Sequence, residues 1–91
     1  MLSNDVEESF QRLAAAFPGF LLLSDVRQAV LLDMCHNLGL FGLLKFKGML
    51  GCVEAKDWEG ASRSMLSSLW RRQVGNRARR LAAMMTTNRW P

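Results

Sequence analysis

The sequence has few cysteines and no long hydrophobic segment. Its 91 residues include only Cys35 and Cys52, which is too few for the disulfide framework of a small secreted protein. We therefore expect buried free thiols, with a single disulfide as the alternative. The longest uncharged stretch, residues 13–24, contains Pro18 and Gly19 and is too short to cross a bilayer. The first eight residues are acidic where a secretory signal needs basic ones. The sequence thus predicts neither a transmembrane segment nor a signal peptide.

Regular alternation of apolar and polar residues is also missing, so no strand is predicted. The chain contains no internal repeat and no low-complexity tract. Hydrophobic residues make up 49% of the chain, with five Phe and three Trp. This apolar content is enough to form a core and argues against a disordered segment. We expect one small domain over residues 1–91, near the lower size limit for a fold with a single core.

Residues that start and stop helices divide the chain into helical segments. Ser3 or Asn4, then Ser24 and Asp57, can each cap a helix N-terminus, and Gly75 or Asn76 can open the last helix. Pro18 with Gly19, and later Gly39, are expected to end helices. The expected helices cover residues 4–17, 25–38, 58–67 and 76–86, with short pieces at 40–46 and 47–55.

The second of these helices is apolar over most of its circumference, as its sequence shows at Val26, Ala29, Val30, Leu31, Leu32, Met34, Cys35 and Leu38. Such a helix belongs in the middle of a domain. The first helix carries one apolar face, formed by Val6, Phe10, Leu13 and Phe17, and Leu81, Met84 and Met85 point inward from the last. The sequence therefore predicts an all-α fold, a small helical bundle around a central buried helix.

The net charge of +4 is concentrated at the C-terminal end, where six of the twelve basic residues lie. The candidate anion-binding residues are Arg71, Arg72, Arg77 and Arg80. Three interpretations are open: a solvated helix face, attraction to the anionic cell envelope, or contact with nucleic acid. Only Gln73 and Asn76 lie near enough to read bases, and the tryptophans are expected in the core. Both observations argue against nucleic acid.

No acidic residue stands out as catalytic. Most of the eight lie at predicted helix starts, and Glu54 is expected on the surface. Asp33 lies on the buried helix and is interpreted as a hydrogen-bonded structural group. His36, Cys35 and Cys52 show no known zinc spacing. Neighbours on a helix do not face each other, which argues against Cys35 and His36 as a nucleophile and its base. We predict no catalytic residue, metal site or cofactor.

A series of motifs along the chain resembles the C-terminal half of phage-type lysozymes of the T-even endolysin kind. The motifs are C-H-N-L-G at 35–39, Phe46, tryptophans at 58, 70 and 90, and N-R-A-R-R at 76–80. The resemblance covers nearly the whole chain, with a length change only around residues 18–24. It implies a lobe-linking helix over residues 1–17 and a helical core over residues 24–91.

The resemblance also implies substrate contacts with peptidoglycan through His36, Asn37, Met49 and Ser64. A partly buried structural histidine is the alternative for His36. Met49 stands where a small hydroxyl residue is usual, and Ser64 is shorter than the expected amide, so we expect weaker glycan affinity. The general acid of the family lies upstream of Met1, so this muramidase-related chain is expected to be inactive alone.

Two functions are compatible with this resemblance. The first is a phage or prophage lobe that recognises peptidoglycan and completes a muramidase with a separate catalytic lobe. It would reside in the host cytoplasm and reach the cell wall only at lysis. The alternative is a repurposed module that binds a host protein through Met49, Leu40, Phe41, Leu43 and Leu44, if these are exposed.

Overall fold

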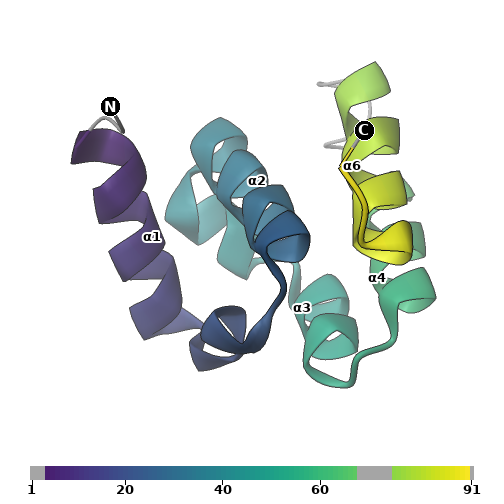
Figure 1. Ribbon diagram of the computed structural model, residues 1–91, viewed down its shortest axis with the longest axis horizontal. Helices are drawn as coiled ribbons and strands as arrows, with labels where there is room; N and C mark the ends of the chain where they lie inside the picture. Colours follow the sequence, from purple (N-terminus) through teal and green to yellow (C-terminus); the bar gives the residue numbers. More distant parts are fainter. Residues whose placement is uncertain (1–3, 68–74, 91) are drawn as a thin grey trace.

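The computed structural model describes residues 4–67 and 75–90, and within these ranges all regular structure is helical. The prediction of an all-α fold is confirmed. The helices are α1 (Asn4–Ala16), the 3₁₀ turn η1 (Pro18–Leu22), α2 (Asp25–Leu44), α3 (Lys47–Glu54), α4 (Trp58–Leu66) and α6 (Asn76–Thr87). Figure 1 shows α1 and α6 on opposite sides of α2, with α3 and α4 following below and behind.

The first helix ends where Pro18 begins η1, because proline favours the first position of a new turn. Leu13 and Phe17 are buried, as their shared face predicts. Phe10 is half-buried and meets the ring of Phe20 edge to face, with centroids 5.0 Å apart. The α1 helix is therefore held against α2 and η1 by aromatic and aliphatic side chains.

The predicted start and break of the second helix are both present. The hydroxyl of Ser24 accepts a hydrogen bond from the backbone N–H of Arg27 at 3.3 Å, which caps the N-terminus. At Gly39 the backbone adopts φ 76° and ψ 162°, a conformation that only glycine adopts readily. Helical turns then resume, so that residues 40–44 continue α2 beyond the predicted end at residue 38.

The later helices also begin at predicted caps. A side-chain oxygen of Asp57 accepts from the backbone N–H of Gly60 at 3.1 Å at the start of α4. Gly75, with φ 58°, precedes α6. Asn88 ends α6 in the left-handed conformation, and its side-chain oxygen accepts a hydrogen bond from the hydroxyl of Ser24. This bond ties the end of α6 to the start of α2.

The core forms around α2, as the sequence predicts. Val30, Leu31 and Met34 are completely buried there, together with Met65 from α4 and Met85 from α6. The α4 helix packs between α3 and α6. The tryptophans depart from the expectation that they lie in the core. Trp58 is half-buried against the core, and Trp90, which follows the last helix, is 61% exposed. Trp70 lies outside the described residues.

Within the described ranges, no single helix is long and apolar enough to span a membrane. By length and composition alone, α2 and α3 pass together as a pair bent by 100°.

Candidate functional site

The two most exposed of the predicted substrate-binding residues, His36 and Asn37, lie on α2 just before the break at Gly39. The amide nitrogen of Asn37 donates to the backbone oxygen of Asp33 and to its carboxylate Oδ1, both at 2.8 Å. The amide oxygen accepts from Arg77 Nη1 at 2.9 Å. The Asn37 side chain is thus fixed by two helices: Asp33 of α2 accepts from its NH₂ group, and Arg77 of α6 donates to its oxygen.

Asp33 and Arg77 complete this polar cluster. Their side chains form an ion pair, with Arg77 Nη1 3.8 Å from Asp33 Oδ1. Asp33 is therefore a hydrogen-bonded group with a structural role, as the sequence predicts. The cluster joins α2 to α6 at the surface and places a guanidinium, an amide and a carboxylate next to one another.

A depression of about 240 Å³ borders His36. Ser9 from α1 lines it together with Leu32, Asp33 and His36 from α2. Its walls combine an imidazole ring, a carboxylate, a hydroxyl and an aliphatic side chain. Sugars are bound by groups of this kind, an apolar or aromatic surface beside a few hydrogen-bonding groups.

Met49 and Ser64 do not join His36 and Asn37 in this cluster. Met49 is completely buried in α3 and has no surface for a ligand, because it faces the core rather than the cleft side. The structure therefore removes it from the predicted substrate-binding residues. Ser64 is half-buried on α4, near Gly48 of α3. No hydrogen bond among the described residues links Ser64 to His36 or Asn37.

The predicted apolar patch is also smaller than expected. Leu43 is completely buried along with Met49, while Leu40 and Leu44 are half-buried against the core. Phe41 alone of this group is strongly exposed, at 82%. The break at Gly39 explains the difference, because it turns the last residues of α2 so that Leu43 faces inward.

The predicted anion-binding arginines fall into three groups. Arg77 is committed to Asn37 and Asp33. Arg80 is exposed on the same helix with no ion pair among residues 4–67 and 75–90. Arg71 and Arg72 lie outside the described residues. Free positive charge on the described part of this helix therefore comes from Arg79 and Arg80.

Both cysteines are free thiols. Burial raises the pKa of the Cys35 thiol, which disfavours the reactive thiolate. Cys52 is half-buried. In the part of the chain that the structure describes, no three His, Cys, Asp or Glu side chains are arranged to hold a metal ion.

A second, larger cavity involves residues for which the sequence predicts other roles. It has a volume of about 550 Å³ and lies between η1 with the start of α2 and the α3–α4 junction. Arg27 and Trp58 face each other beside it, with the guanidinium carbon 3.8 Å from the ring centroid. The sequence indicated only a core tryptophan at position 58. A basic residue facing that tryptophan can be recognised only once the two helices are placed together.

Comparison with known proteins places the chain near phage-type lysozymes. No protein-family model matches it. It is 31% identical over 65 residues to "Probable T4-type lysozyme 1" of Dictyostelium discoideum, a match that covers 71% of this chain and 38% of that protein. It is 30% identical over 83 residues to "Pre-baseplate central spike protein Gp5" of Enterobacteria phage T4, covering 91% of this chain and 14% of that protein.

The chain therefore spans well under half the length of these curated relatives. Together with the all-α fold, the two similarities support a phage lysozyme-like relationship.

Proposed function

We propose that this chain binds the glycan of peptidoglycan through the surface formed by His36, Asn37 and Arg77. The observation that carries the proposal is the orientation of Asn37 by Asp33 and Arg77 next to the exposed ring of His36. Asp33 uses both N–H groups of Asn37, so the remaining lone pair of its oxygen is what can accept from a sugar hydroxyl or an acetamido N–H. An amide held in one orientation loses little entropy on such binding. The similarity to a protein named as a T4-type lysozyme supports the same ligand.

The charge of this surface fits the ligand. Peptidoglycan carries carboxylates on its peptide parts, and Arg80, three residues after Arg77 on α6 and so on the same side of the helix, is exposed. Exposed cations of this kind raise the association rate with an anionic polymer and are screened by salt. Ser64 remains a proposed second contact from α4.

We infer that the chain recognises this substrate without cleaving it alone. Hydrolysis needs a carboxylic acid and a second carboxylate on either side of the scissile bond. Three of the described carboxylates have other roles: Asp33 binds Asn37 and Arg77, Asp57 caps α4, and Glu8 pairs with Arg12. A separate lobe would supply the acid and complete a muramidase. In this proposal the chain resides in the host cytoplasm until lysis.

Retention on purified sacculi tests the binding. Wild-type chain should sediment with them, and Asn37→Ala or His36→Ala should reduce the bound fraction severalfold. Gln11→Ala is the matched control, because it removes an exposed amide from α1. Absence of wild-type retention, or equal retention of the Asn37 and Gln11 variants, would contradict the proposed surface.

A turbidity assay tests the lack of independent cleavage. The chain alone should leave a suspension of sacculi unchanged, and addition of the N-terminal lobe of a phage-type lysozyme should start clearing. Clearing by the chain alone would show that it carries its own catalytic carboxylates.

The second candidate function, a module that binds a host protein, is favoured by one observation, the 82% exposure of Phe41. An exposed aromatic ring flanked by half-buried leucines can anchor a protein interface. Loss of host-protein binding in Phe41→Ala, with sacculus binding unchanged, would assign this surface to a protein partner.

A further inference from the structure

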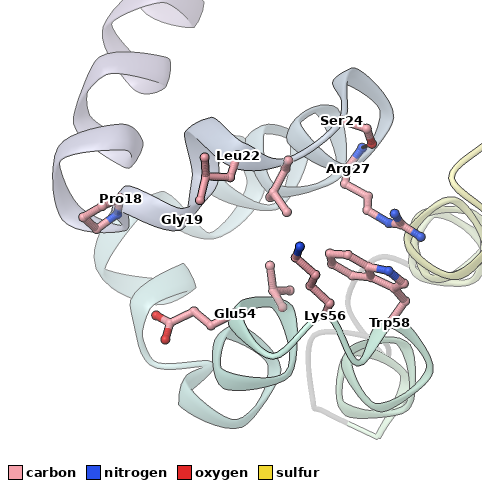
Figure 2. A pocket seen from close by; sticks show the side chains of 10 residues that line it. Pro18, Gly19, Leu22, Ser24, Arg27, Glu54, Lys56 and Trp58 are labelled. Carbon is pink, nitrogen blue, oxygen red and sulfur yellow. Dashed lines mark hydrogen bonds between the residues drawn. The ribbon is translucent and has the colours of Figure 1, made fainter.

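The cavity of about 550 Å³ between η1 and the α3–α4 junction has the size and lining of a small-molecule site. Ligand pockets commonly occupy about 300–1,000 Å³, with apolar walls and a few polar groups. We refer to it as the Lys56 groove, and its lining residues are Pro18, Gly19, Leu22, Leu23, Ser24, Arg27, Val53, Glu54, Lys56 and Trp58. Figure 2 shows two facing walls, one from η1 and the start of α2, the other from α3 and α4.

The walls of the groove are largely apolar. The charged side chains that line it are not paired with one another. Leu22, which lines the groove, is 88% exposed. Arg27 and Lys56 are both cationic, and neither forms an ion pair with a described residue. Glu54 points away from Lys56 at the opposite end of the groove in Figure 2. The middle of the groove is therefore positive.

Arg27 is already bound to the protein. Its Nε donates to the backbone oxygen of Met85 at 2.8 Å, its Nη2 donates to that of Thr86 at 3.3 Å, and its guanidinium stacks on Trp58. The ammonium group of Lys56 forms no hydrogen bond or ion pair with a described residue. In Figure 2 its ammonium group reaches from the α3–α4 junction into the gap, beside the indole of Trp58. Lys56 is thus the cation available to a ligand.

The backbone conformation of Lys56 is the second notable feature of the groove. Lys56 has φ 61°, in the left-handed region that favours glycine. Its N–H donates to the oxygen of Val53 at 3.1 Å and the N–H of Asp57 donates to that of Cys52 at 2.8 Å, which together form a Schellman motif. Glycine is the usual residue at this position. A lysine there places a charged side chain in the groove at a position where the backbone alone would prefer glycine.

We propose that the Lys56 groove binds a small amphipathic anion, an apolar or aromatic body carrying one carboxylate, sulfonate or phosphate. The ammonium of Lys56 binds the anionic group, and Leu22, Val53 and the indole of Trp58 contact the body. None of the groove residues belongs to the His36 and Asn37 surface. This site is therefore independent of the proposed glycan binding, and failure of one leaves the other intact.

Two matched fluorescent probes test the site. 8-Anilinonaphthalene-1-sulfonate carries an anionic group, and N-phenyl-1-naphthylamine has nearly the same aromatic body without it. The sulfonate should bind at one site, more tightly than the neutral probe, and decanoate should displace it while decanol should not. Lys56→Gln should weaken sulfonate binding about tenfold, because a charge-assisted contact is lost. Lys56→Arg should largely retain it.

Lys45→Gln is the control, since it removes an exposed lysine outside the groove. Its affinity for the sulfonate should equal that of the wild type. Near-ultraviolet circular dichroism should be the same for all variants, which excludes probe binding to a loosened core. Binding of phosphatidylglycerol vesicles with the same Lys56 dependence would identify a lipid source of the anion, and binding of decanoate alone would identify a soluble one.

Three results would overturn the proposal. Equal affinity for the charged and neutral probes would show that Lys56 does not select an anion. Equal loss in Lys56→Gln and Lys45→Gln would show only general charge attraction. A dimer in sedimentation equilibrium that dissociates on Leu22→Ser would show that a second copy occupies the groove.

Discussion

The guanidinium carbon of Arg27 lies 3.8 Å from the centroid of the Trp58 ring, and the same guanidinium donates to two backbone oxygens at the end of α6. One side chain from α2 therefore connects the start of α4 with the end of α6. Partial burial lowers the pKa of Arg27, although it remains charged in the physiological range because guanidinium groups titrate far above it.

A double-mutant cycle should detect this stacking. Arg27→Met and Trp58→Leu are each expected to lower the free energy of unfolding, and the coupling between them should be about 1 kcal/mol, the usual size of a partly desolvated cation–π contact. Urea denaturation of the four proteins measures it. A coupling near zero would show that the two side chains stabilise the fold separately.

Leu31→Ala should be among the most destabilising single substitutions. Leu31 is completely buried on the central helix, so its truncation leaves a cavity and should cost about 3 kcal/mol. This magnitude is carried over from buried leucines in a phage lysozyme core. Leu22→Ala is the matched control, since an 88% exposed leucine should lose little. Similar denaturation midpoints for the two variants would contradict the placement of α2 at the centre.

Two glycine substitutions should have opposite effects. Gly39→Ala should lower the free energy of unfolding by about 1–3 kcal/mol, because its backbone conformation is strained for any other residue. Gly51→Ala should raise it by about 0.5–1 kcal/mol, because Gly51 lies inside α3. An added Cβ meets nothing within 4 Å at either position, so the difference isolates the backbone. Thermal melts would measure it.

Lys56→Gly should leave the stability almost unchanged. Relief of the left-handed conformation gains about 1 kcal/mol, and the larger unfolded-state entropy of glycine offsets about 0.4–1 kcal/mol of it. Lys56→Val should instead destabilise, because a β-branched residue fits this conformation poorly. Denaturation of both variants separates this backbone effect from the role of the lysine charge in ligand binding. A large loss in Lys56→Gly would assign the lysine a structural role.

The fold should lose stability at alkaline pH because of Cys35. Burial raises the pKa of its thiol above the ordinary value of 9.0, so the unfolded chain releases its proton first. The stabilising contribution is complete below about pH 9 and is lost as the pH rises through the higher value in the folded state. The alkaline loss should be smaller in Cys35→Ala than in the wild type. Cys52→Ala is the control, and an identical alkaline loss in all three proteins would exclude Cys35 as the cause.

The helix boundaries follow from short-range chemistry, and the sequence predicts them well. Ser24 and Asp57 cap helices through bonds to N–H groups three residues ahead, and Gly39 breaks α2 where its backbone requires glycine. These interactions involve only neighbouring residues, so their residue types suffice to identify them. The burial of Leu31 follows in the same way from the apolar circumference of its helix.

The sites depended on the packing of distant segments. Asn37 meets Arg77 across 40 residues, and Arg27 meets Trp58 only because α2 lies beside the start of α4. Met49, expected on the cleft wall, is buried, because the orientation of α3 is set by its packing against α4 rather than by its own sequence. Local residue types thus determined where most of the helices begin. Only the tertiary structure decided which side chains share a surface, since that depends on the helix rotations that fill the core.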